Sequence, residues 1–149
     1  MPDSTRDFFL SDSETKTLAH GKEFAGQLKK LPALILLNGV VGAGKTTWIK
    51  GFVSGYLKKK IVVTSPSYSL LNSYTDGKKE IIHGDFYRLQ GLDDLESIGF
   101  WDFLNSKRVI IVEWGNLLTP QSWPADLQVY TINFEIKGET SRSLTCFFR

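Results

Sequence analysis

Residues 38–51 read NGVVGAGKTTWIKG, and no other segment of the sequence says as much about its architecture. Within it, residues 39–46 match the phosphate-binding pattern G-x-x-x-x-G-K-[ST] at every fixed position. The apolar run 33–37 that precedes the pattern has the length of a strand, and residues 47–53 predict the first turns of a helix. A strand, a glycine loop and a helix start are the setting that the pattern requires.

The chemistry of such a loop is specific. Glycines let successive backbone N–H groups turn inward, and the start of the helix adds unpaired donors and a positive dipole end. Lys45 is expected to reach the β- and γ-phosphates of a nucleotide, and Thr46 to place its hydroxyl on Mg²⁺. The residues expected to bind the nucleotide are Gly39, Gly42, Ala43, Gly44, Lys45, Thr46 and Thr47.

Length and composition predict an ordinary globular protein. The 149 residues are most simply one domain, and a net charge of +2 gives no strong electrostatic sign of a nucleic-acid or membrane partner. The N-terminus lacks the features of a signal peptide, and no apolar run approaches the ~18 residues of a membrane span. The single cysteine, Cys146, lies in an apolar run and is expected in the core. We expect a cytoplasmic protein that is not bound to a membrane.

Strand-like and helix-like patterns alternate along the chain. Helices are expected at 11–30, from the glycine loop to 57, and at 92–104. Strands are expected at 33–37, 61–63, 69–74, 80–83, 109–112, 129–136 and 143–148. Asp76 and Gly77 lie between two of these strands and indicate a hairpin. The order predicts an α/β P-loop sandwich, with a central mixed, largely parallel sheet flanked by helices.

Two acidic residues are candidates to complete the site. Glu113 follows the β-branched run 109–112, so it should emerge at the carboxyl edge of the sheet, where ligands bind in open α/β sheets. Asp85 also follows a short apolar strand, and its carboxylate could hold the hydrated metal or orient the attacking water. Gly84 would let both His83 and Asp85 approach this site. The serines at 65–69 suit a loop near phosphate and an ordinary turn nearly equally.

Three classes of P-loop protein can be compared. A GTPase is disfavoured because the chain has neither Asn-Lys-x-Asp nor Asp-x-x-Gly. A small-molecule kinase usually needs a lid with several arginines, whereas the five arginines of this chain are scattered. A nucleotide-dependent binding module with slow turnover suits a compact chain best, and the kinase remains the alternative. From the residues alone, the chain is an ATP-type P-loop protein with acids at Asp85 and Glu113.

The motifs taken in order resemble the bacterial TsaE (YjeE) family. They are GAGKTT at 42–47, SPSYSL at 65–70, HGDFYRL at 83–89, ESIGF at 96–100 and VEW at 112–114. The resemblance implies the ATPase of tRNA threonylcarbamoyladenosine biosynthesis at position 37, with ATP and Mg²⁺ as cofactors. It also implies slow hydrolysis that a TsaB–TsaD heterodimer stimulates, and contact with tRNA only through that complex.

The family roles carry over by position. Lys45, Asp85 and Glu113 match residues important for hydrolysis, and Thr46 and Glu113 match the Mg²⁺-associated residues. Trp114 matches a tryptophan beside the site, although an aromatic core residue is an equal alternative. The departures are Val40 where the family usually has Asp, Ser67 where it has Thr, and Gly115 where Pro is common, together with the lack of an acidic residue at 115–118.

Overall fold

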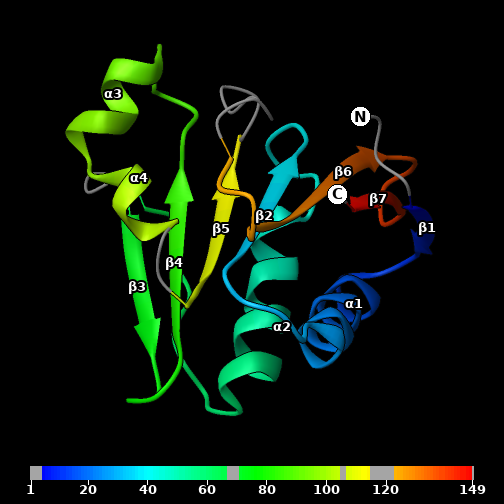
Figure 1. Cartoon of the computed structure of the whole chain (residues 1–149). Coiled ribbons are helices and arrows are strands. Elements are labelled where there is room, and N and C mark those ends of the chain that lie inside the picture. Colours follow the sequence, from blue (N-terminus) through cyan, green and yellow to red (C-terminus); the bar gives the residue numbers. More distant parts are fainter. Residues whose placement is uncertain (1–4, 67–70, 105–106, 115–122, 149) are drawn as a thin grey trace.

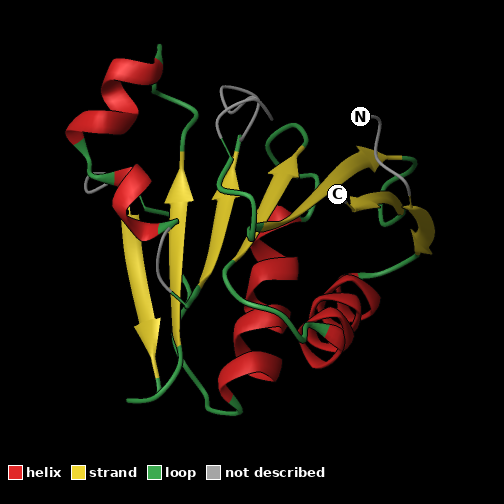
Figure 2. Cartoon of the chain, viewed as in Figure 1, coloured by secondary structure: helices red, strands yellow, loops and turns green. Residues whose placement is uncertain are grey.

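A computed structural model describes residues 5–66, 71–104, 107–114 and 123–148 of the chain. Its strands form one seven-stranded sheet in the order β1-β7-β6-β2-β5-β4-β3, which Figure 1 shows as a single fan. Figure 2 shows the helices packed around this sheet. The strands are β1 Thr5–Ser11, β2 Ala33–Asn38, β3 Leu71–Thr75, β4 Glu80–Asp85, β5 Val109–Glu113, β6 Gln128–Ile136 and β7 Arg142–Phe148. The helices are α1 Glu14–Gln27, α2 Lys45–Leu57, α3 Leu92–Ser97 and α4 Phe100–Phe103.

The centre of the sheet is parallel and both of its edges are antiparallel. Strands β6, β2, β5 and β4 run in one direction, and β3 at one edge runs against β4. On the other side of the sheet, β7 runs antiparallel to both β6 and the edge strand β1. Every residue of β5 is buried, as its unbroken β-branched run predicts for a strand covered on both faces. The predicted mixed α/β P-loop fold is therefore confirmed.

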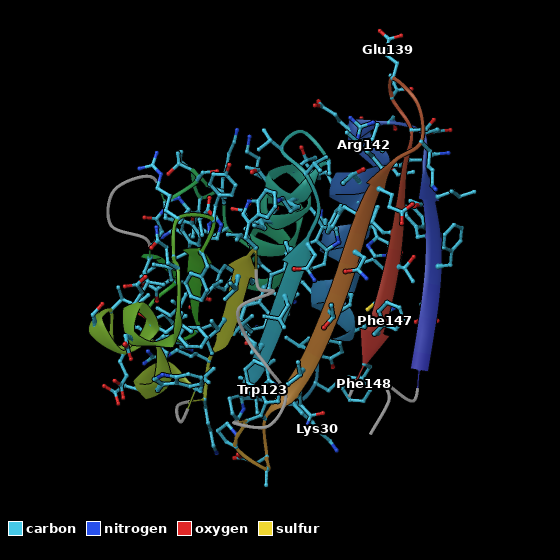
Figure 3. All side chains as sticks on the ribbon, turned by 90° about the horizontal axis from the view of Figure 1, so that it is seen from above. Lys30, Trp123, Glu139, Arg142, Phe147 and Phe148 are labelled. Carbon is cyan, nitrogen blue, oxygen red and sulfur yellow. The ribbon has the colours of Figure 1, made fainter. Side chains whose placement is uncertain are left out.

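Alternate residues of the central strands face two separate cores. Ile35 and Ile111 point to the face that α1 and α2 cover. Leu34 and Ile110 point to the opposite face, where they pack with Leu95 of α3 and other apolar side chains. Figures 1 and 3 show α1 and α2 together on one side of the sheet. This alternation also settles which side of the sheet each strand-end residue faces.

Helices α1 and α2 approach each other almost backbone to backbone. A Cβ atom added to Gly51 would lie 1.9 Å from the carbonyl oxygen of Leu18, and one added to Gly21 would lie 2.2 Å from that of Trp48. Only glycine fits such a contact, because every obstructing atom belongs to the main chain. The close contact fixes the start of α1 relative to the glycine loop that precedes α2.

Two predicted hairpins are confirmed. The turn between β3 and β4 is held by Asp76, whose Oδ1 accepts hydrogen bonds from the backbone N–H groups of Lys78 (2.8 Å) and Lys79 (2.7 Å). Strands β6 and β7 pair antiparallel through the turn at 137–141. Cys146 lies in β7, as predicted, where it is half-buried and packs against the core beneath α1 and α2.

The strand predicted at 61–63 is wrong. Residues 61–63 form no strand and do not join the sheet. Val63 is buried in the core beneath α2, whereas Val62 is 83% exposed. The positions beside β5 are taken by β2 and β4. The carbonyl oxygen of Thr64 instead accepts hydrogen bonds from two side chains, the amide of Asn72 (3.0 Å) and the hydroxyl of Tyr74 (3.2 Å).

The helix boundaries also differ from expectation. The single helix predicted at 92–104 is two helices, because Gly99 adopts φ 74°, a left-handed conformation that ends the first. Helix α1 begins after Ser13, whose side chain caps it, and ends at Gln27 rather than near 30. Strand β1 was not predicted at all. None of the helices in the described part of the chain is long and apolar enough to cross a membrane.

Candidate nucleotide-binding site

The glycine loop joins β2 to α2 at the carboxyl edge of the sheet. Gly39, Gly42 and Gly44 have φ angles of 153°, 84° and 102°, which side-chain-bearing residues rarely adopt. A Cβ on Gly39 would also lie 2.9 Å from the carbonyl oxygen of Phe134 in β6. Gly44 is the N-cap of α2, so the unpaired N–H groups of this helix begin at the loop.

Helix α1 supports the loop from one side. Thr17 is 2% exposed, and its methyl group would touch a Cβ atom on Gly44 at 3.5 Å. The Thr17 hydroxyl shares a 2.7 Å hydrogen bond with the hydroxyl of Ser11 at the end of β1. A buried polar contact thus ties the first turn of α1 to the end of β1, and this turn lies beside the glycine loop.

The two predicted acids lie side by side. Asp85 and Glu113 are register partners at the ends of the neighbouring parallel strands β4 and β5. Glu113 lies two residues after Ile111 in β5, and Asp85 lies beside Glu113 in the sheet. Both side chains therefore face the same side as Ile111, which is the side of α2 and the glycine loop. Beyond β5, the N–H of Trp114 donates to the carbonyl of Leu37 (3.0 Å), which keeps this strand end beside β2.

Lys45 lies between the loop and the acids. Its ammonium donates a hydrogen bond to the carbonyl of Gly39 and lies 3.8 Å from the centroid of the Trp114 ring. Burial lowers the pKa of Lys45, and the nearby carboxylates of Glu113 and Asp85 act in the opposite direction. Burial also raises the pKa of Asp85, against a hydrogen bond from the backbone N–H of Tyr87. The site therefore brings one ammonium group and two carboxylates together around one cavity.

Trp114 belongs to this site and not to the core. Its φ of 61° is unusual for a residue with a side chain, and its half-exposed ring lies under the Lys45 ammonium. The Tyr87 ring lies 4.9 Å from the Trp114 ring, centroid to centroid. The structure therefore supports the interpretation that Trp114 lies beside the site over the interpretation that it is a core residue. The departures at Ser67 and 115–118 fall outside the described residues.

A cavity of about 650 Å³ joins these parts. Of the predicted site residues, those that line it are Gly42, Gly44, Lys45, Thr46, Thr47, Asp85 and Glu113. Gly39 and Ala43 do not line it: Gly39 shapes the loop, and the Ala43 side chain is buried in the core. Ser65 lines the cavity as well, in agreement with a loop near phosphate.

Arg142 is a cavity residue that sequence reasoning did not assign. It opens β7, and its guanidinium donates a 3.1 Å hydrogen bond to the carbonyl of Gly42. It also donates to the carbonyls of Gly138 (3.0 Å) and Ser141 (2.9 Å), which ties the β6–β7 turn to the glycine loop. Figure 3 shows Arg142 near this turn, at the opposite end of β7 from Phe148. Nothing in the local sequence marks this arginine, because its place depends on strand pairing.

His83 is the second residue that was not assigned a role. Its ring is fully buried, with Nε2 2.8 Å from Oε2 of Glu113 and Nδ1 3.0 Å from the hydroxyl of Tyr74. Asp85 lines the cavity, whereas His83 does not line it and reaches the site only through its bond to Glu113. Sequence alone gave no sign that His83 bonds Glu113, since the contact crosses from β4 to β5.

The oxygen-bearing side chains fit a magnesium ion better than a transition metal. Thr46 and Glu113 line the same cavity, and Asp85 lies beside Glu113. No group of three or more His, Cys, Asp or Glu residues that could hold a metal occurs among the described residues. Mg²⁺ is usually bound through one or two carboxylates together with water and nucleotide oxygens, so this sparse donor set suits it.

These features define the class of protein. A glycine loop between a buried parallel strand and a helix, with carboxylates ending the adjacent strands, is the arrangement of P-loop proteins. A family model described as "Threonylcarbamoyl adenosine biosynthesis protein TsaE" matches residues 11–144. The chain belongs to the TsaE family, as its motifs predicted.

Individual relatives agree with this assignment. A tRNA threonylcarbamoyladenosine biosynthesis protein TsaE of Bacillus subtilis is 31% identical over 136 residues, which cover 91% of this chain and 80% of the relative. The protein of the same name from Aquifex aeolicus is 32% identical over 93% of both chains. The crystal structure of Bacillus subtilis YdiB aligns with a TM-score of 0.74 at 28% identity, covering 97% of this chain and 86% of that one.

Proposed function

We propose that residues 1–149 act as a single cytoplasmic ATPase domain in the biosynthesis of threonylcarbamoyladenosine at position 37 of tRNA. In this proposal the chain binds MgATP in the 650 Å³ cavity and hydrolyses its γ-phosphate slowly. The observation that carries the proposal is the convergence of Lys45, Thr46, Asp85 and Glu113 on one cavity beside a glycine loop. Membership of the TsaE family supports the pathway.

The glycine loop would hold the phosphates. Backbone N–H groups from Gly42 to Thr47 surround the start of α2, where a phosphate is stabilised by donors and by the helix dipole. The Lys45 ammonium, which bonds the Gly39 carbonyl and contacts the Trp114 ring, is close enough to the loop to exchange these partners for phosphate oxygens. Its burial would strengthen that charge–charge contact.

The carboxylates would serve the metal and the attacking water. Thr46 and Glu113 are the residues that would hold Mg²⁺, and the ion when bound neutralises charge on the phosphates. Asp85 would either hold the hydrated metal or orient the attacking water. As an ionised carboxylate, it would accept a hydrogen bond from that water.

A partner would control the rate. By resemblance, the partner is a TsaB–TsaD heterodimer, and tRNA is contacted only through this complex. The described site offers little to hasten hydrolysis by itself, since Arg142, the cavity arginine among the described side chains, is engaged with main-chain carbonyls. The same observation disfavours a small-molecule kinase, whose lid usually supplies several arginines to the phosphates.

The proposal is tested by separating binding from turnover. Lys45→Met should abolish tight ATP binding in titration calorimetry, whereas Lys50→Met, at an exposed position of the same helix, should bind normally. Asp85→Asn and Glu113→Gln should lower hydrolysis far more than they lower ATP affinity. Unchanged affinity in Lys45→Met would overturn the phosphate-loop assignment. Wild-type rates in both acid variants, with partners present, would overturn the roles given to the carboxylates.

A further inference from the structure

A chain of buried hydrogen bonds lies behind Glu113. From Oε2 of Glu113 it passes to Nε2 of His83 (2.8 Å), from Nδ1 of His83 to the hydroxyl of Tyr74 (3.0 Å), and from that hydroxyl to the carbonyl of Thr64 (3.2 Å). His83 is 0% exposed and Tyr74 is 6% exposed. The chain crosses β5, β4 and β3 and ends at the residue before Ser65, which lines the cavity.

The chemistry of these groups fixes how the ring is used. An ionised carboxylate only accepts hydrogen bonds, so the contact with Glu113 requires the proton on Nε2 of His83. Nδ1 of a neutral ring is then an acceptor, so it shares the single proton of the Tyr74 hydroxyl with the carbonyl of Thr64, which also only accepts. The ring is therefore held at both nitrogens and cannot rotate without losing a buried bond. Apolar side chains could fill this volume equally well, but none could hold the carboxylate.

The burial of Glu113 and its place at the cavity explain why a hydrogen-bond donor is needed here. Its side chain is 5% exposed, so the carboxylate would be costly to bury without a donor. One oxygen bonds His83, while the residue still lines the cavity beside Asp85. A carboxylate with one oxygen held by a hydrogen bond keeps a fixed orientation toward a ligand that binds it from the cavity.

We propose that His83, supported by Tyr74, is a positioning residue that holds the Glu113 carboxylate in the orientation needed to bind the divalent cation of the metal–nucleotide complex. Through Tyr74 and Thr64, the same bonds hold the segment that carries Ser65 against this acid. The inference rests on the proposed function, because it takes Glu113 to be a metal-binding residue. It adds an assignment for two side chains that touch neither nucleotide nor metal.

Three variants separate positioning from packing. His83→Phe keeps a flat ring in the core but removes both hydrogen bonds. His83→Gln places an amide N–H within reach of Glu113, whereas the shorter His83→Asn does not reach it. Tyr74→Phe removes only the hydroxyl that holds Nδ1 of His83.

The measurement uses Mn²⁺ in place of Mg²⁺, with ADP as the nucleotide. Electron paramagnetic resonance of free Mn²⁺ gives the metal affinity of the protein–ADP complex, and ADP affinity in the presence of EDTA gives nucleotide binding without metal. We expect His83→Phe to weaken Mn²⁺ binding by about 10- to 100-fold. We expect metal-free ADP affinity to stay within about twofold, since this substitution leaves the phosphate loop intact. His83→Gln should recover most of the metal affinity, and Tyr74→Phe should lose a smaller part.

Each possible result either supports or contradicts the positioning role of His83. Wild-type Mn²⁺ affinity in His83→Phe would overturn the inference, as would an equal loss of metal-bound and metal-free ADP affinity, which indicates general disruption. If His83→Phe does not fold, the comparison of His83→Gln with His83→Asn replaces it, and equal metal affinities in that pair would contradict the inference. Failure of the wild-type protein to bind ADP would instead refute the proposed function itself, before any variant is compared.

Discussion

Replacing Gly51 by alanine tests the contact that holds α1 against α2. The added Cβ would lie 1.9 Å from the carbonyl oxygen of Leu18, about 1.5 Å short of ordinary van der Waals contact, which begins at 3.4 Å. It would also lie 2.8 Å from the carbonyl carbon of the same residue. Both obstructing atoms are backbone, so no side chain can move aside. The two helices must separate or tilt.

The expected cost follows from two opposing effects. Overpacking a well-packed contact costs about 1–3 kcal/mol, and the rigid main chain at this site favours the upper end. Alanine in place of glycine inside a helix returns about 1 kcal/mol through its better helix propensity. We expect a net loss of about 2 kcal/mol in the free energy of unfolding, a large part of the ~5–15 kcal/mol that stabilises a typical domain.

Gly26 supplies the matched control. It also lies in a helix, α1, but a Cβ atom there would meet nothing within 4 Å. Gly26→Ala should therefore raise stability by up to about 1 kcal/mol. Urea unfolding followed by circular dichroism measures both variants. If Gly51→Ala is as stable as Gly26→Ala, the close helix contact does not hold the protein together as argued.

Three further predictions concern the site and its support. Lys45→Ala should abolish tight ATP binding in titration calorimetry, because no other described side chain places a cation between the loop and the acids. Arg142→Ala should weaken ATP binding by about 3- to 10-fold, since its bond to the Gly42 carbonyl shapes the loop; an unchanged dissociation constant would contradict this role. His20 accepts a 2.9 Å hydrogen bond from the indole N–H of Trp48, and burial lowers its pKa below the ordinary 6.5. The unfolded chain therefore takes up this proton at a higher pH than the folded protein does, so stability should fall as pH drops below about 6.5. The slope is a fraction of the ~1.4 kcal/mol per pH unit of a full proton, because the ring is partly solvated. Urea midpoints measured across this pH range should change less in His20→Asn, which keeps an acceptor but does not titrate, and equal slopes would refute the argument.

The central elements were predictable because their signals are local. The runs 33–37 and 109–112 are unbroken and apolar, so both predicted strands, and the second also predicted burial on both faces. The structure confirms β2 and β5. Strand β1 was missed because its stability comes from pairing with β7, at the far end of the chain. The apolar residues 61–63 gave a false strand because Val63 packs in the core without pairing in the sheet, and local sequence does not distinguish these two ways of burying an apolar run.

The residues of the candidate site also fall into those that the local sequence predicted and those that it did not. The residues of the glycine loop follow one another in the chain, and Asp85 and Glu113 each end an apolar strand, so pattern and spacing found them. Arg142 contacts the loop from the start of β7, and His83 in β4 bonds Glu113 in the neighbouring strand β5. These two contacts depend on strand order and register, which a single sequence does not specify. Whether Trp114 lies beside the site or in the core was open for the same reason, since its positive φ turns the chain after β5.

The central claim is that partner contact controls ATP turnover at this site. The most direct test is steady-state ATP hydrolysis by the pure protein, alone and with a TsaB–TsaD pair from the same source, with Lys45→Met as the control for contaminating activity. We expect slow turnover alone, a clear rise with the pair, and neither in the Lys45 variant. ATP binding with no response to the pair would contradict partner control, and a phosphoryl acceptor would then have to be sought.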